Sequence, residues 1–276
     1  MFKNLNCGAL GHKADFELTV KLAAEYGFGG VDADLDYARQ KGAAHVKDLL
    51  AKNKLKLGGF GLGVKWREGD SDKDYAESLG AFVADCKTAA ELGVTRCSTW
   101  VMPASDKLSY REHFDLFVAR MRPVAQILKG FGQSLGLEFI GPRTIRAGKK
   151  HGFVYTMDGM RATACAIGTG NVGMLLDCWH WYTAQSTLTD IEQLDAKEVV
   201  YVHVNDAPKG VHVNDQVDNK RELPGTGVID LKGFFGALRK IGYDGPITVE
   251  PFNQPLREMK LEAAVKATAA SLDKTM

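Results

Sequence analysis

Short apolar runs alternate with amphipathic segments of helical period along the whole chain, and this alternation limits the folds that the chain can adopt. A strand followed by a helix, repeated many times, builds a parallel sheet that helices cover. Strands buried on both faces appear as continuous apolar runs, as Gly173-Met-Leu-Leu-Asp177 does. We interpret eight runs as strands: Leu5–Leu10, Gly30–Leu35, Leu55–Val64, Val94–Trp100, Leu135–Ile140, Gly173–Asp177, Val199–Val204 and Pro246–Glu250.

The segments between these runs have the apolar spacing and the end signals of helices. Eight strand-and-helix units in about 250 residues have the size of a (β/α)8 barrel. Composition does not change sharply along the chain, so we predict a single α/β domain, a (β/α)8 TIM barrel with a parallel eight-stranded core, over residues 1–276. The helices that we expect are Asp15–Tyr26, Tyr37–Asn53, Asp74–Leu92, Ser109–Phe131, Tyr155–Ile167, Thr189–Leu194, Leu231–Ile241 and Leu256–Lys274.

A doubly wound sheet is the alternative for an alternating chain, and it needs a glycine-rich phosphate loop after its first strand. Cys7-Gly-Ala-Leu-Gly11 matches that loop poorly. Gly58-Gly-Phe-Gly-Leu-Gly63 lies within the third unit, where no convincing helix begins on it. The barrel is therefore our prediction.

Charge and cysteine content exclude several classes of protein. The net charge of +1 gives no general excess of base for a polyanion, and no lysine or arginine block stands out, so we expect no nucleic acid partner. The five cysteines are odd in number and show no paired spacing, which is typical of reduced thiols in a cytoplasmic protein. No stretch approaches the ~18 apolar residues of a membrane span, and the first residues lack the apolar core of a signal peptide.

Polar residues stand at the ends of four predicted strands: Glu138, Asp177, His203 and Glu250. In a barrel these side chains can converge on the axis at the catalytic face. Three carboxylates and one imidazole would repel one another there unless a cation lay among them. This donor set fits one divalent ion, Mn²⁺ or Mg²⁺ best, with Co²⁺ and Zn²⁺ as alternatives. Each residue alone also has a structural explanation, such as a helix cap, an ion pair or a buried histidine.

The motifs around these residues resemble the xylose isomerase-like TIM-barrel superfamily, the sugar phosphate isomerase/epimerase family. The resemblance covers nearly the whole chain, and the order and spacing of the motifs are more specific than any single motif. The motifs are Gly136-Leu-Glu138-Phe, Leu175-Leu-Asp177-Cys-Trp-His180, Val202-His203-Val-Asn-Asp206, Pro224-Gly225-Thr-Gly227 and Thr248-Val-Glu250-Pro.

The resemblance implies roles for individual residues. Glu138, Asp177, His203 and Glu250 correspond to the shared metal ligands of the family. By the same resemblance, His180 corresponds to a histidine that contacts the substrate beside the metal, and Arg221 to a substrate-binding arginine. Barrels of this family often form dimers or tetramers, so a homo-oligomer is a further expectation.

The expected chemistry is proton transfer on a keto-sugar or a related polyol ketone. A divalent ion that chelates a carbonyl and its neighbouring hydroxyl acidifies the carbon-bound proton and stabilises the enediolate. Glu138 and Glu250 lie on predicted strands five and eight, three apart around an eight-stranded ring, so they can flank a ligand. We hypothesise that both are metal ligands and also the acid–base pair of a sugar isomerase or epimerase.

Several further residues lie at or just beyond strand ends and are candidates for substrate contact. An indole ring can cover the C–H face of a sugar while polar groups bind its hydroxyls. The alternative for each ring is packing at the rim of the barrel, and for His12 and Asp34 it is loop capping. The candidates are Trp66, Trp100, Trp179, Trp181, His12, Asp34 and Arg143.

One departure from the family pattern bears on the substrate. Ketose 3-epimerases of this superfamily usually have a second glutamate shortly after the strand-five glutamate, where this chain has Arg143 and Arg146. An arginine near the metal suits a carboxylate or phosphate on the substrate, or an oxyanion. A lyase that dehydrates an inosose-like ketone, or eliminates from a 3-keto-glycoside, is therefore the alternative to an isomerase.

Two other classes use the same barrel. An endonuclease IV-like nuclease needs additional histidines at the ends of strands two to four, and strands three and four end without one in Gly61-Leu-Gly-Val and Ser98-Thr-Trp100. A non-catalytic sugar-binding subunit has no need for a buried charge cluster.

Overall fold

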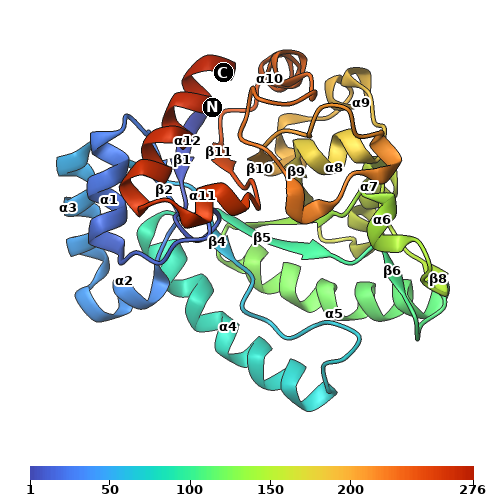
Figure 1. Cartoon of the computed structure of the whole chain (residues 1–276). Helices are drawn as coiled ribbons and strands as arrows, with labels where there is room; N and C mark the ends of the chain where they lie inside the picture. The colour runs from blue at the N-terminus through green and yellow to red at the C-terminus, as the bar shows by residue number, and fades with distance from the viewer.

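The computed structural model describes residues 1–276, and its centre is a curled parallel sheet of nine strands in the order β3-β2-β1-β11-β10-β9-β7-β5-β4 (Figure 1). Three of the four six-residue strands are largely apolar runs, as the sequence predicts, whereas the strand Arg96–Val101 is mixed. The strands are β1 Phe2–Leu5, β2 Gly30–Val31, β3 Lys56–Leu57, β4 Phe60–Gly61, β5 Arg96–Val101, β7 Ser134–Phe139, β9 Val172–Asp177, β10 Val199–Val204 and β11 Pro246–Val249. This architecture is consistent with the predicted α/β TIM-barrel fold.

Helices follow the strands and pack against the outside of the sheet (Figure 1). Each helix that begins with a side-chain cap has a serine, threonine, aspartate or asparagine at that position, as in Ser109, which forms a capping box with Glu112. The helices are α1 Phe16–Glu25, α2 Leu35–Lys41, α3 Ala43–Asn53, α4 Asp72–Leu92, α5 Tyr110–Gly130, α6 Arg143–Arg146, α7 Met157–Ile167, α8 Cys178–Thr183, α9 Leu188–Glu192, α10 Leu231–Lys240, α11 Gln254–Glu258 and α12 Leu261–Thr275.

The two end strands of the sheet, β3 and β4, are halves of one chain segment. The prediction of a single strand over Leu55–Val64 was wrong, because Gly58 and Gly59 interrupt it. β3 pairs with β2, whereas β4 pairs with β5. A Cβ on Gly58 would lie 2.6 Å from side-chain oxygens of Asn4 and Asp32, so the chain can cross between its two neighbours only where the residue has no side chain.

Two predicted helices are each divided in the structure, the first of them at a glycine. The predicted helix Tyr37–Asn53 is two helices, α2 and α3, because Gly42 between them has φ +87°. The predicted helix over Leu256–Lys274 is likewise divided, into α11 and α12. A short antiparallel pair of β6 (Ala104–Ser105) and β8 (His151–Gly152) joins two loops that the sequence analysis left without structure.

The apolar core lies between the sheet and its helices. Helix α10 shows why: Leu231, Phe234, Phe235 and Leu238 are buried, while the charged residues of the same helix lie on its other side. The inside of the sheet differs, because buried polar side chains fill part of it. There the Tyr201 hydroxyl donates to Asp32 at 2.6 Å.

Strand register places the polar strand ends at one level. In the parallel pairing, Trp100 lies opposite Glu138, and His203 lies opposite both Asp177 and Thr248. The carboxyl ends of the strands therefore hold a ring of polar residues at one end of the sheet, where ligands of such folds bind.

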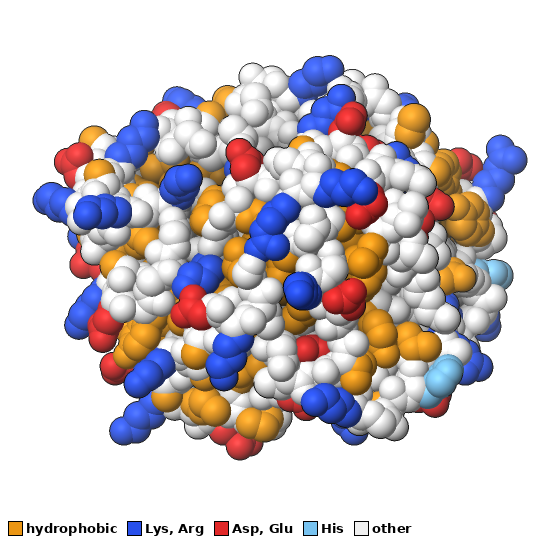
Figure 2. Space-filling view, turned by 90° about the horizontal axis from the view of Figure 1, so that it is seen from above, with side chains coloured by type: hydrophobic (Ala, Val, Ile, Leu, Met, Phe, Trp, Pro, Cys, Tyr) orange, Lys and Arg blue, Asp and Glu red, His pale blue; other side chains and the backbone are white.

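None of the helices combines the length and the apolar character needed to cross a bilayer. The face of the molecule in Figure 2 has lysine and arginine side chains interspersed with aspartate and glutamate, without a block of one sign.

The close contacts around Gly58 lead to a stability prediction. We expect Gly58→Ala to lower the free energy of unfolding by about 1–3 kcal/mol, because the new methyl group overpacks the interior. Gly61→Ala is the matched control, since a Cβ there meets nothing within 4 Å. Urea unfolding monitored by circular dichroism measures both variants, and equal midpoints would contradict this account of the junction.

Candidate functional site

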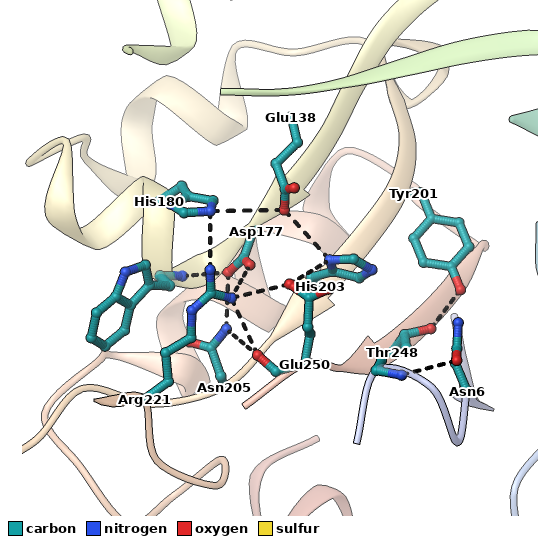
Figure 3. A network of polar contacts seen from close by, with 12 residues as sticks. Asn6, Glu138, Asp177, His180, Tyr201, His203, Asn205, Arg221, Thr248 and Glu250 are labelled. Carbon is teal, nitrogen blue, oxygen red and sulfur yellow. Dashed lines mark hydrogen bonds and ion pairs between the residues drawn. The ribbon is translucent and has the colours of Figure 1, made fainter. Parts of the chain in front are cut away.

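The structure brings together the four residues that the sequence places at strand ends (Figure 3). Glu138 lies one residue before the end of β7, Asp177 ends β9, His203 lies on β10, and Glu250 follows β11. One donor atom from each lies within 4.8 Å of the other three, and Glu138 and Asp177 are buried. Glu138 and Glu250 come from strands three apart in the sheet order and approach from opposite sides.

The donor geometry fits one divalent ion. Ligands bonded to an ion at about 2.1 Å lie up to about 4.2 Å apart, so small shifts would close this set around a cation. His203 Nδ1 lies 3.4 Å from Glu138 Oε1 and 3.4 Å from Glu250 Oε2. Both His203 Nδ1 and Glu138 Oε1 are buried without a hydrogen-bond partner. Buried polar atoms without a partner are rare, and an ion would satisfy both.

The crowding shifts the protonation of the cluster. Burial raises the pKa of Glu138 to about 7. Burial opposes charge on Glu250 as well, but His203 and Arg221 outweigh it and lower the pKa of Glu250. For His203, burial acts to lower the pKa, whereas Glu250 and Glu138 outweigh it and raise it well above the usual value. A proton is thus held inside the cluster until a cation replaces it.

Arg221 supplies a fixed positive charge at the base of the cluster, although it comes from the loop after β10. It is only 1% exposed. Its Nη1 donates to Asp177 Oδ2 at 2.8 Å and to Glu250 Oε2 at 3.2 Å, and its Nη2 donates to Asp218 at 2.8 Å. The guanidinium also lies 4.5 Å from the centre of the Phe252 ring. Arg221 therefore lies among the candidate ligands and compensates part of their charge.

His180 is buried on α8, and both of its ring nitrogens face N–H donors. Burial lowers its pKa to about 3, so the ring is neutral. The backbone N–H of Gly141 lies 3.3 Å from Nδ1, and Arg221 Nη2–H, which can only donate, lies 3.2 Å from Nε2. A neutral imidazole has a single acceptor nitrogen, so only one of these two contacts is a full hydrogen bond. Nε2 also lies 3.9 Å from Glu138 Oε1, so this edge of the ring faces the cluster.

Two neighbours of His203 that the sequence analysis assigned no role support the site. Asn205 Nδ2 donates to Asp177 Oδ1 at 3.1 Å and to the Glu250 carbonyl at 3.2 Å. Asp206 accepts hydrogen bonds from the backbone N–H groups of Ala207, Gly225 and Ile229, and so holds the Pro224–Gly227 turn. Both belong to the motif Val202-His203-Val-Asn-Asp206, directly after the strand that carries a predicted ligand, and this was the signal that could have found them.

The predicted aromatic contacts lie in different environments. Trp179 is fully buried, Trp66 and Trp181 are also buried, and Trp100 alone is exposed, at 44%. The Arg221 guanidinium lies 5.5 Å from the centre of the Trp179 ring, so Trp179 lies against the site from within the protein. Contact of these rings with a substrate stays a prediction.

The other rim candidates lie outside the cluster of donors. Asp34 caps α2 by accepting from the Tyr37 N–H at 2.8 Å, which is the structural role considered for it. His12 Nε2 lies 3.0 Å from the Leu256 carbonyl. Arg143 begins the short helix α6 and is exposed to solvent. Substrate contact by His12 or Arg143 stays a prediction.

Comparisons with known proteins agree with the fold. The profile of the xylose isomerase-like TIM barrel family matches residues 20–275. A xylose isomerase domain protein from Alicyclobacillus acidocaldarius is 30% identical, with a TM-score of 0.86 over 96% of this chain and 95% of that one. An inosose isomerase from Halalkalibacterium halodurans is 25% identical over 231 residues, 84% of this chain and 79% of that protein. The IolI protein, solved with a bound zinc atom, has the same fold, with a TM-score of 0.81 at 20% identity over 100% of this chain and 98% of that one.

The charge balance in the cluster leads to a stability prediction for Arg221→Gln. In EDTA we expect a loss of about 3–5 kcal/mol in the free energy of unfolding, because buried carboxylates lose their counter-charge. Saturating Mn²⁺ should restore part of the loss by binding the native state. Arg161→Gln, which removes a half-exposed pair with Glu198, is the control and should cost less than about 1 kcal/mol. A loss in Arg221→Gln that is the same with and without Mn²⁺ would refute the shared role of arginine and ion.

The protonation of the cluster leads to a pH prediction. Below a pH of about 7, Glu138 is increasingly protonated and His203 holds a proton, so both compete with a metal ion. The affinity for Mn²⁺ should therefore rise with pH through neutrality, and binding should release protons. Calorimetric titration in two buffers of different ionisation enthalpy measures the release. An affinity that does not change with pH would be inconsistent with these ligands.

Proposed function

Because the chain belongs to the xylose isomerase-like TIM barrel family, we propose that it is a divalent-metal-dependent sugar isomerase or epimerase. In this proposal the substrate is a keto-sugar or a related polyol ketone, and the reaction is the transfer of a carbon-bound proton. The observation that supports it best is the placement of Glu138 and Glu250. Both carboxylates lie 3.4 Å from one imidazole nitrogen and approach it from strands three apart.

The proposed ion is held by Glu138, Asp177, His203 and Glu250, which offer three carboxylates and one imidazole. We propose Mn²⁺, since oxygen-rich sites with one nitrogen suit a hard or borderline cation. When bound, such an ion polarises a carbonyl oxygen and stabilises the negative charge left by the loss of a neighbouring proton.

The chain's own residues move the proton. One of the two glutamates takes it from the substrate carbon, and the other returns a proton from the opposite side, which changes either the configuration or the position of the carbonyl. Arg221 Nη2–H lies beside His180 at the edge of the cluster and would bind a substrate oxygen on which charge develops. The exposed Trp100 ring, opposite Glu138 in the sheet register, would cover an apolar face of the sugar.

We propose that β3 and β4 together take the place of one strand, so that residues 1–276 form a single eight-stranded barrel. All five cysteines are unpaired in the structure, which supports a reducing, cytoplasmic setting. The proposed partner is a small sugar rather than a nucleic acid or a membrane, and a homo-oligomer is part of the proposal.

Solvent exchange tests the function. The Mn²⁺-loaded protein is incubated in D₂O with a panel of keto-sugars and inososes, and products are analysed by NMR and mass spectrometry. We expect deuterium at one carbon of an isomerised product, whereas a product that has lost water would indicate the lyase alternative. No turnover of any compound, or products without deuterium, would contradict the proposal.

Variants test the proposed role of Glu138. Glu138→Gln keeps the shape of the side chain but removes the base, so we expect exchange to fall by about 10²-fold or more. Asp34→Asn is the control, because asparagine preserves the cap of α2 at the rim and should leave exchange unchanged. Exchange in Glu138→Gln at the level of the unsubstituted protein, with Mn²⁺ bound, would exclude Glu138 from the acid–base pair.

A further inference from the structure

A second cavity, of about 320 Å³, lies at the rim of the sheet beside the candidate site. Three segments form it: the chain that follows β4, the chain that follows β5 up to the start of α5, and the loop that follows α6. All three follow strand ends on the same face as Glu138. Trp66, Arg67, His113, Lys107 and Lys149 are among its lining residues.

The lining has three buried nitrogen atoms without a partner: Trp66 Nε1, Arg67 Nε and His113 Nδ1. Trp66 is 4% exposed and His113 is 7% exposed, so solvent reaches these rings poorly. Leaving a buried polar group unpaired is costly, and most native structures avoid it. Indole and guanidinium N–H groups can only donate, so only a ligand with acceptor atoms would satisfy them.

Arg67 is positioned for such a ligand. Its guanidinium stacks 3.8 Å from the centre of the Trp100 ring and 4.7 Å from that of Trp66. It donates one long hydrogen bond, at 3.5 Å to the Trp100 carbonyl, and has no ion-pair partner. Burial lowers the pKa of Arg67 from its usual value, and the nearby Asp70 carboxylate acts in the opposite direction without forming an ion pair with the guanidinium.

The charges around Arg67 favour an anion. Lys149 is paired with Asp106 at 2.6 Å, so these two cancel. Glu68 faces the same cavity and would repel an anion, but its carboxylate accepts from the Ser105 hydroxyl at 2.6 Å. Lys107 at the cavity has no ion-pair partner, so among the lining residues Arg67 and Lys107 together exceed Glu68 by one positive charge. Asp70 lies outside the lining but acts on Arg67 as a negative charge, and its carboxylate accepts from the Arg67 backbone N–H at 2.7 Å.

The segment that contains Arg67 is fixed before any ligand binds. Arg120 on α5 is 7% exposed and donates to the carbonyls of Trp66 at 3.2 Å, Arg67 at 2.8 Å and Asp70 at 3.0 Å. It also forms an ion pair with Asp72 at 2.8 Å. A binding group held in place in this way loses little conformational entropy when a ligand arrives.

The cavity also adjoins the proposed site of chemistry. Trp100, on which Arg67 stacks, lies directly opposite Glu138 in the pairing of β5 with β7. We infer that this cavity binds an oxyanion of the substrate, a carboxylate or a phosphate, through Arg67, Trp66 Nε1 and His113. The assignment of that anion to the substrate rests on the proposed function, whereas the binding of an anion here does not.

Titration with small anions tests the cavity directly. Inorganic phosphate and acetate are added separately to the full chain at constant ionic strength, with methyl acetate as the uncharged probe, and tryptophan fluorescence is followed. We expect saturable binding of phosphate or acetate, weakened about 10-fold or more by Arg67→Gln through loss of a charge-assisted hydrogen bond. Arg161→Gln removes an arginine that lies outside the cavity and pairs with Glu198, and it should leave binding unchanged. Thermal unfolding confirms that each variant is folded, and Trp66→Phe, which removes only the indole N–H, should weaken binding less than Arg67→Gln.

The results separate the two anions and the two proposals. Saturation by phosphate alone or by acetate alone assigns the group, and in either case supports the site. No saturable binding, or equal binding by Arg67→Gln, overturns it, whatever the outcome of the deuterium experiment. With substrates that turn over, Arg67→Gln should raise KM for anionic keto-sugars and leave KM for neutral ones unchanged. A site that binds anions in a protein without deuterium exchange would refute the proposed function and leave the anion site standing.

Discussion

The concentration of negative charge at one end of the sheet is the constraint on which the rest of the site depends. Three carboxylates meet one imidazole in a buried space, and they repel one another unless positive charge is placed among them. Arg221 supplies part of that charge permanently, through bonds to Asp177 and Glu250. Because Glu138 Oε1 and His203 Nδ1 are left without partners, the protein's own cation does not complete the balance. A second cation between them would satisfy both atoms.

The same constraint ties the site to the way the sheet curls. Glu138 and Glu250 can face one another only because the sheet between them curls. The interruption at Gly58 and Gly59 lets a single segment pair with β2 on one side and β5 on the other. Below the candidate ligands, Asn4 donates to Asp32, Tyr201 and Thr248, so the interior of the curled sheet is linked by hydrogen bonds. The Tyr201 ring then meets the His203 ring edge-on, at 5.5 Å between centres. The Gly58 junction, the hydrogen bonds in the interior of the sheet and the candidate ligands are therefore connected by contacts.

Sequence reasoning located most of the elements and the four donors because both depend on local pattern. The first strand was predicted wrongly at Leu5–Leu10, since β1 is Phe2–Leu5, and the short helix α8 was not predicted. Buried parallel strands are apolar throughout, and a polar residue that ends such a run is visible in the sequence. The split of the third strand was not visible, because it depends on how closely Asn4 and Asp32 approach Gly58. Asn205 and Asp206 were overlooked for a similar reason: the groups that they bind, Asp177 and the Pro224–Gly227 turn, are distant in the chain. Contacts that are set by tertiary distance leave little trace in spacing or composition.

Two arginines near the site, Arg143 and Arg67, differ in their exposure to solvent, and this difference decides how strongly each can bind an anion. The sequence placed Arg143 after the strand-five glutamate and suggested an anionic substrate from it. In the structure, Arg143 follows Pro142 on a four-residue helix and extends into solvent, where water competes for its charge. Arg67, from a loop that attracted attention only for Trp66, stacks between two indole rings instead. There an ion is less screened by water, so the same guanidinium attracts an anion more strongly. Arg67 rather than Arg143 therefore supports an anionic substrate, because burial and stacking decide how strongly a guanidinium binds an anion.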